Sequence, residues 1–122
     1  MSLRILAVDD SLTMREMLRQ TLTEAGFHVV LAEDGLDALE RLQGADPDLI
    51  LTDLNMPKLD GFGLIDAVRS GVVSSRVPIL VLTTESAAAL KERARAAGAT
   101  GWITKPFDEV SLVSTIRRVA AV

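Results

Sequence analysis

The chain has 122 residues, of which 48% are hydrophobic and 25% charged, values that are typical of globular proteins and exclude a disordered one. Its 13 Lys and Arg side chains are outnumbered by 17 Asp and Glu, so the net charge of -4 argues against a nucleic-acid-binding surface. Because there is no cysteine, disulfides, thiolate zinc sites and thiol nucleophiles are excluded.

Five short apolar runs alternate along the chain with segments of helical periodicity. The runs are aliphatic or β-branched without polar alternation, as in strands that are buried on both faces. In chain order, they predict strands at residues 5–8, 29–32, 49–51, 79–82 and 102–104. Apolar spacings of three and four residues predict helices in the ranges 14–25, 38–42, 64–68, 87–97 and 112–119.

Residues that commonly begin and end helices flank these segments. Candidate N-caps precede three of the predicted helices: Asp10 or Ser11, then Asp34, and finally one of Thr83, Thr84 and Ser86. Four of the predicted helices are expected to end at glycines, namely Gly26, Gly44, Gly71 and Gly98. These signals support the element boundaries that periodicity indicates.

A strand followed by a helix therefore occurs five times in one chain. Strands joined through helices run parallel, because each right-handed crossover returns the chain to the same edge of the sheet. We expect an α/β protein with helices on both faces of a parallel sheet, forming one domain over residues 1–122. The longest apolar stretch, near 77–82, is far shorter than the ~20 residues of a membrane span. With no signal peptide apparent, no membrane insertion and a cytoplasmic location are expected.

Chemically reactive side chains follow four of the five predicted strands. Asp9 and Asp10 follow the first strand, Asp53 the third, Thr83 the fourth and Lys105 the fifth. Taken singly, each has a structural explanation as a helix cap or a turn residue. Ligands of open parallel sheets, however, bind outside the carboxyl ends of the strands. The joint pattern therefore predicts a functional site at this edge.

These motifs resemble the response-regulator receiver domains of two-component signalling, and among them the stand-alone chemotaxis regulators. The resemblance covers essentially the whole chain. It is carried by Val-Asp-Asp-Ser at 8–11, Leu-Thr-Asp-Leu-Asn-Met-Pro at 51–57, Asp-Gly at 60–61, Thr-Thr-Glu at 83–85 and Lys-Pro-Phe at 105–107. It implies a single doubly wound (βα)5 flavodoxin-like domain whose parallel sheet has the order 2-1-3-4-5.

The resemblance also implies a phosphoryl transfer reaction. Asp53 would be the phosphoacceptor, and a sensor histidine kinase of the chemotaxis type would be the donor. Thr83 and Lys105 would bind the phosphoryl oxygens, and the same site would hydrolyse the product. The chain would then be a signalling switch that catalyses only its own phosphorylation and dephosphorylation. His28, the single histidine, lies near the start of the second strand and so at the opposite edge, which excludes it as an internal donor.

A magnesium site is implied by the same resemblance. Asp10 and Asp53 would ligate Mg²⁺ directly, together with the backbone carbonyl of Asn55, while Asp9 would act mainly through a coordinated water. Three carboxylates that converge in one cleft repel each other unless a cation is present. Oxygen ligands of this kind are those that Mg²⁺ prefers.

The resemblance further places a conformational switch at Thr83 and Trp102. In the family, the threonine moves onto the phosphoryl group and an aromatic residue of the fifth strand rotates inward. That aromatic is usually Tyr or Phe, whereas Trp102 is larger and donates through an indole N–H, so a static tryptophan is the alternative. Asn55 and Glu85 match the positions that tune hydrolysis, and Leu54 stands where the enterobacterial chemotaxis protein has Trp.

Several functions remain open at this point. A stand-alone monomer would bind an output protein such as the flagellar motor switch, whereas a DNA-binding regulator or a phosphate sink would use the same chemistry. Dimerising transcription factors usually carry an acidic pair before the aromatic residue, and the run at 99–102 lacks it. An aspartyl phosphatase would need an acid in place of Asn55. A flavin protein would need a phosphate-binding loop where Asp9 and Asp10 would repel the phosphate.

Overall fold

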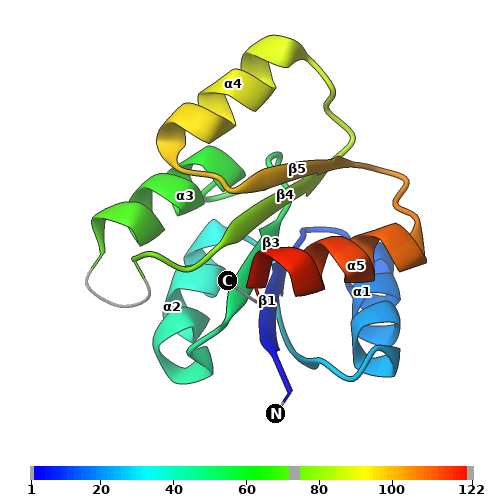
Figure 1. Cartoon of the computed structure of the whole chain (residues 1–122). Coiled ribbons are helices and arrows are strands. Elements are labelled where there is room, and N and C mark those ends of the chain that lie inside the picture. The colour runs from blue at the N-terminus through cyan, green and yellow to red at the C-terminus, as the bar shows by residue number, and fades with distance from the viewer. Residues whose placement is uncertain (1, 72–74, 121–122) are drawn as a thin grey trace.

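The computed structural model describes residues 2–71 and 75–120, which form five strands and five helices (Figure 1). The strands are β1 (Arg4–Val8), β2 (His28–Ala32), β3 (Leu49–Thr52), β4 (Ile79–Thr83) and β5 (Gly101–Thr104). The helices are α1 (Leu12–Glu24), α2 (Gly35–Ala45), α3 (Gly61–Ser70), α4 (Ala88–Ala97) and α5 (Glu109–Ala120). Each predicted strand is confirmed, with bounds that differ by at most one residue.

The five strands form one parallel sheet in the order β2-β1-β3-β4-β5. This confirms the predicted α/β class and the strand order that the family resemblance implies. Val8 pairs with Thr52 across β1 and β3, so the residues that follow them, Asp9 and Asp53, leave the sheet side by side. The sheet register therefore brings two acids together without any help from a loop.

Two separate apolar clusters hold the helices against the sheet. Successive residues of a strand point to opposite faces, so in β1 Leu6 joins one cluster and Ala7 the other. The first cluster lies beneath α2, α3 and α4 and includes Ile65, whereas the second lies beneath α1 and α5 and includes Leu22 and Ile116 (Figure 1). Burial of each such side chain stabilises the fold by about 1.5–3 kcal/mol.

Side-chain caps fix the start of the first two helices as predicted. The Ser11 hydroxyl accepts a hydrogen bond from the backbone N–H of Met14 at 3.2 Å, and the Asp34 carboxylate accepts one from Asp37 at 2.9 Å. Each bond satisfies an amide that the first helical turn leaves without an intrahelical partner. Among the described segments, none of the helices is both long and apolar enough to cross a membrane.

Two predictions of the residues that cap helices are wrong. Gly44 does not end α2, which continues to Ala45 and ends at Asp46 in a left-handed conformation with φ of 43° that Asp tolerates. At the start of α4, the cap position is Ala87, with no side-chain hydrogen bond. The predicted hydroxyl caps lie too early in the chain, because residues 84–87 form a loop between the end of β4 and the helix.

Arg69 connects the end of α3 to the end of α4. Its Nε and Nη2 donate to the carbonyl of Gly98 at 3.0 and 2.9 Å, and its Nη1 donates to the carbonyls of Ser75 and Val77. Burial lowers the pKa of this guanidinium. Gly98 has a φ of 114° and ends α4 as predicted, so Arg69 neutralises carbonyl charge at a helix C-terminus.

Candidate functional site

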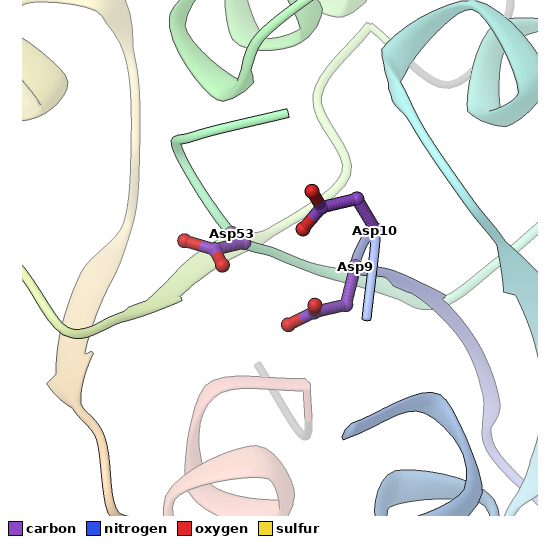
Figure 2. Close-up of side chains that lie close together, drawn as sticks. All are labelled: Asp9, Asp10 and Asp53. Carbon is purple, nitrogen blue, oxygen red and sulfur yellow. The ribbon is translucent and has the colours of Figure 1, made fainter. Parts of the chain in front are cut away.

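Three carboxylates converge at the carboxyl edge of the sheet, as Figure 2 shows. Asp9 and Asp10 follow β1, Asp53 follows β3, and each offers a carboxylate oxygen within 4.8 Å of the others. Asp9 is 1% exposed and Asp53 9% exposed, whereas Asp10 is open to solvent. The predicted acidic site is therefore assembled, with two buried members and one accessible member.

Lys105 reaches into this cluster from the end of β5. Its ammonium Nζ lies 2.7 Å from Asp9 Oδ2 and 2.9 Å from Asp53 Oδ2, which forms two ion pairs. Burial by itself would lower the pKa of Lys105, but the hydrogen bonds and charges of the two carboxylates outweigh it and raise the pKa. The lysine is therefore a fixed cation beside Asp53, at a position from which it can bind charge that develops there.

Backbone amides orient the two buried carboxylates. Asp9 Oδ1 accepts a hydrogen bond from the N–H of Ser11 at 2.9 Å, and Asp53 Oδ1 accepts one from the N–H of Leu54 at 2.6 Å. Within the described residues, the Asp10 carboxylate has no hydrogen bond. Two acids are thus held in place, and the third is available to a ligand from solvent.

The donor set fits a divalent cation such as Mg²⁺. All three side chains offer hard carboxylate oxygens, and carbonyl or water oxygens complete such shells in proteins. One lysine cannot balance three carboxylates, so the cluster retains negative charge that a cation would neutralise. Asn55, the remaining predicted ligand through its carbonyl, lies on the exposed loop two residues after Asp53.

Thr83 and Glu85 lie on the neighbouring strand and the loop that follows it. The fully buried Thr83 ends β4, beside β3, and its hydroxyl accepts a hydrogen bond from the N–H of Glu85 at 3.4 Å. The Glu85 carboxylate accepts another from the Asn55 amide, also at 3.4 Å. The described residues show no direct hydrogen bond between Thr83 and Asp53, which lie at the ends of the neighbouring strands β4 and β3.

Trp102 connects this loop to β5. Its indole N–H donates to the backbone carbonyl of Glu85 at 3.2 Å, and its half-buried ring packs against the cluster beneath α2, α3 and α4. The ring also lines a cleft between α4 and β5 with a volume of about 160 Å³, together with Lys91, Ala94 and Arg95. The predicted switch residue therefore touches both the site loop and an open surface.

Sequence reasoning missed several polar contacts of the site. The Lys105 bond to Asp9 was absent from the prediction, which placed the lysine against Asp53 and its phosphoryl group. The guanidinium of Arg15 donates to the Asp9 carbonyl at 2.8 Å, and no sequence signal besides its helical position indicates that contact. His28, as predicted, is exposed at the start of β2, the end of the strand opposite the acids.

The chain resembles known proteins over nearly its full length. A family model described as the response regulator receiver domain matches residues 5–117. Chemotaxis protein CheY1 of Helicobacter pylori is 41% identical over 107 residues, 86% of each chain. Response regulator MprA of Mycobacterium ulcerans is 39% identical over 96% of this chain, which spans about half the length of that relative.

Solved structures share the fold closely. The chemotaxis protein CheY4 of Vibrio cholerae is 44% identical and superimposes with a TM-score of 0.93, covering 98% of this chain and 99% of its own. The receiver domain of sensor histidine kinase PA1611 from Pseudomonas aeruginosa is 28% identical, with a TM-score of 0.91 and full coverage of both chains. That structure has a magnesium ion coordinated in its active site cleft.

Proposed function

The chain belongs to the response regulator receiver domain family, and from that premise we propose that Asp53 accepts a phosphoryl group from a sensor histidine kinase. One observation carries the proposal. The Asp53 carboxylate is held between the Lys105 ammonium at 2.9 Å and the Leu54 amide at 2.6 Å, within 4.8 Å of two further acids. A carboxylate nucleophile that is fixed beside an ammonium group and a candidate metal site is suited to attack on a phosphoryl group.

The phosphoryl transfer has one acceptor, the Asp53 carboxylate, and one leaving group, the imidazole of the donor histidine. A carboxylate oxygen of Asp53 forms a bond to phosphorus as the bond from phosphorus to the donor histidine nitrogen breaks. The leaving imidazole takes up a proton from water, and Asp53 carries the acyl phosphate. Lys105 and the Thr83 hydroxyl bind the transferred oxygens, which stabilises their charge.

Mg²⁺ is the cofactor that this donor set supports. Asp10, Asp53 and the carbonyl of Asn55 would hold it directly, and Asp9 would act through a coordinated water. When bound, it supplies neutralisation of charge on the phosphoryl oxygens. Lys105 already bonds Asp9 and Asp53, so the exposed Asp10 is the acid that an incoming ion reaches first.

We propose chemotaxis as the pathway, with an output protein such as the flagellar motor switch. The similarity to two chemotaxis regulators supports this proposal, and the cleft beside Trp102 gives the site a route to an exposed surface.

The acting species would be a monomer, and light scattering of the phosphorylated chain measures its oligomeric state. A stable dimer on phosphorylation would instead favour the receiver half of a DNA-binding regulator, and a phosphate sink remains the other alternative.

The test uses a small acyl phosphate donor with Mg²⁺ and intact-mass spectrometry. The wild-type chain gains one phosphoryl group, and Asp53→Asn loses it because an amide is a poor nucleophile. Asp66→Asn, a change to an exposed acid on α3, serves as the matched control and labels like the wild type. Full labelling of the Asp53→Asn variant at another residue would contradict the assignment.

A further inference from the structure

The indole N–H of Trp102 makes a hydrogen bond that a Phe at this position could not make. It donates to the backbone carbonyl of Glu85 at 3.2 Å, across the gap between β5 and the loop after β4. The ring itself packs against the core, so its position is set by burial as well as by the bond. The loop at Glu85 is therefore held to β5 through this hydrogen bond.

Glu85 in turn reaches across the site. Its carboxylate accepts from the Asn55 amide at 3.4 Å, so one bond links the loop after β4 to the loop after β3. These are the loops that follow Thr83 and Asp53, between which a phosphoryl group on Asp53 would lie. Asp53 and Thr83 are buried, whereas Asn55 is exposed and Glu85 half-buried, so the link lies on the solvent side.

Hydrolysis of the acyl phosphate needs a water from that side. The water oxygen forms a bond to phosphorus as the bond from phosphorus to the Asp53 carboxylate oxygen breaks, with the two oxygens roughly in line. Asp53 is released as a carboxylate, and both protons of the water leave with the phosphate as dihydrogen phosphate. Because the leaving oxygen is on the buried side, the attacking water approaches from the solvent side, where the Asn55–Glu85 link lies.

We propose that Trp102 is a positioning residue that slows this hydrolysis. Its N–H holds the Glu85 backbone, which keeps the Glu85 carboxylate against Asn55 and limits the approach of water. The inference rests on the proposed phosphorylation of Asp53. It assigns to the indole a role in the lifetime of the phosphorylated state that is separate from any rotation of the ring.

The experiment compares Trp102→Phe, Glu85→Ala and the double variant with the wild type. Each full-length chain is loaded with an acyl phosphate and Mg²⁺, the donor is removed, and phosphate release is timed. Trp102→Phe keeps an aromatic ring but removes the donor, and we expect about 2- to 10-fold faster hydrolysis, the rate equivalent of one hydrogen bond. In the Glu85→Ala background, the same change has less than about a 2-fold effect, because the linked carboxylate is already gone.

A matched control separates positioning from stability. Ile103, the next residue of β5, packs into the opposite cluster, so Ile103→Val perturbs the strand without touching the Glu85 loop. Urea unfolding measures the stability of each variant, and Ile103→Val keeps the wild-type hydrolysis rate even if it unfolds earlier. If Ile103→Val accelerated hydrolysis as much as Trp102→Phe does, the cause would be a general destabilisation of β5, and the role of the indole would be overturned.

The two proposals fail in different ways. If the wild-type chain gains no phosphoryl group on Asp53, the proposed function fails before hydrolysis is measured. If the wild type is labelled but Trp102→Phe releases phosphate at the wild-type rate, only the positioning role is overturned. A Trp102→Phe effect of the same size with and without the Glu85 side chain overturns it too, because the indole would then act by another route.

Discussion

Removal of Lys105 tests how the acidic cluster is stabilised in the absence of a metal. In Lys105→Met, the buried Asp9 and Asp53 carboxylates lose their shared cation while the apolar part of the side chain is kept. Breaking a buried ion pair costs about 3–5 kcal/mol, whereas an exposed pair contributes about 0–1 kcal/mol. The side chains of Lys105, Asp9 and Asp53 are only 10%, 2% and 12% exposed, respectively. The exposed Asp10, however, opens the cluster to water. We therefore expect a loss of about 3 kcal/mol in the free energy of unfolding.

Urea unfolding in a chelator at neutral pH measures this loss. With an m-value of about 1.5 kcal/mol/M, the midpoint falls by about 2 M. Saturating Mg²⁺ recovers more stability in Lys105→Met than in the wild type, because the lysine no longer competes for the Asp9 and Asp53 oxygens. Lys91→Met, on the exposed face of α4, is the control and stays within about 0.5 kcal/mol of the wild type.

The difference in unfolding free energy between the wild type and Lys105→Met depends on pH with a definite sign. The folded-state pKa of Lys105 is raised above its usual 10.5, so its contribution is complete below that pH and disappears as pH rises through the folded value. The gap in stability between the wild type and Lys105→Met therefore persists through neutral pH and closes in strong alkali, as Lys105 loses its proton. A variant as stable as the wild type at neutral pH in chelator would refute the claim that the ion pairs compensate the buried acids.

Two further predictions concern the metal and the switch. Titration calorimetry is expected to show weaker Mg²⁺ binding for Asp10→Ala than for Asp9→Ala, because direct ligation contributes more than ligation through water; equal loss would contradict that division. Beryllofluoride with Mg²⁺, a mimic of the phosphorylated state, is expected to shift the emission of Trp102, the single tryptophan, more than Mg²⁺ alone does. The Thr83 hydroxyl touches the Glu85 amide and Glu85 touches the indole, so Thr83→Ala should bind the mimic yet lose much of the shift. Unchanged emission with bound mimic would make Trp102 static.

The strands and helices were predictable because their signals are local, whereas the strand order came from the family resemblance. Each central strand is an uninterrupted aliphatic run, and β1, β3 and β4 are buried along almost every residue, so hydrophobicity marks them directly. The acids at the strand ends were predictable for a related reason. Parallel strands place their carboxyl ends at one edge, and the strand order that the family resemblance implies makes β1 and β3 neighbours, so Asp9 and Asp53 were expected to lie close together.

Contacts that depend on side-chain reach were less accessible from the sequence. Lys105 and Asp9 are 96 positions apart in the sequence. Their hydrogen bond depends on a conformation in which the long lysine side chain reaches across the sheet. The bonds of Glu85 to Trp102 and Asn55 depend on the path of an irregular loop, which periodicity does not describe. The start of α4 was predicted to within one residue, but its cap was not, because a helix held by packing needs no capping side chain.

The division of the interior into two clusters affects how the protein tolerates substitution. Leu22 lies on the α1 side of the sheet and Ile65 on the α3 side, with the buried strands between them. Side chains that share no neighbour change stability independently, typically additively within about 0.3–0.5 kcal/mol. A library of variants that repacks the cluster beneath α1 and α5 can therefore be selected for stability separately from a library that repacks the cluster beneath α2, α3 and α4. The stabilising substitutions from the two libraries can then be combined. Designers would thus have one half of the interior to vary while the half that contains Trp102 stays fixed.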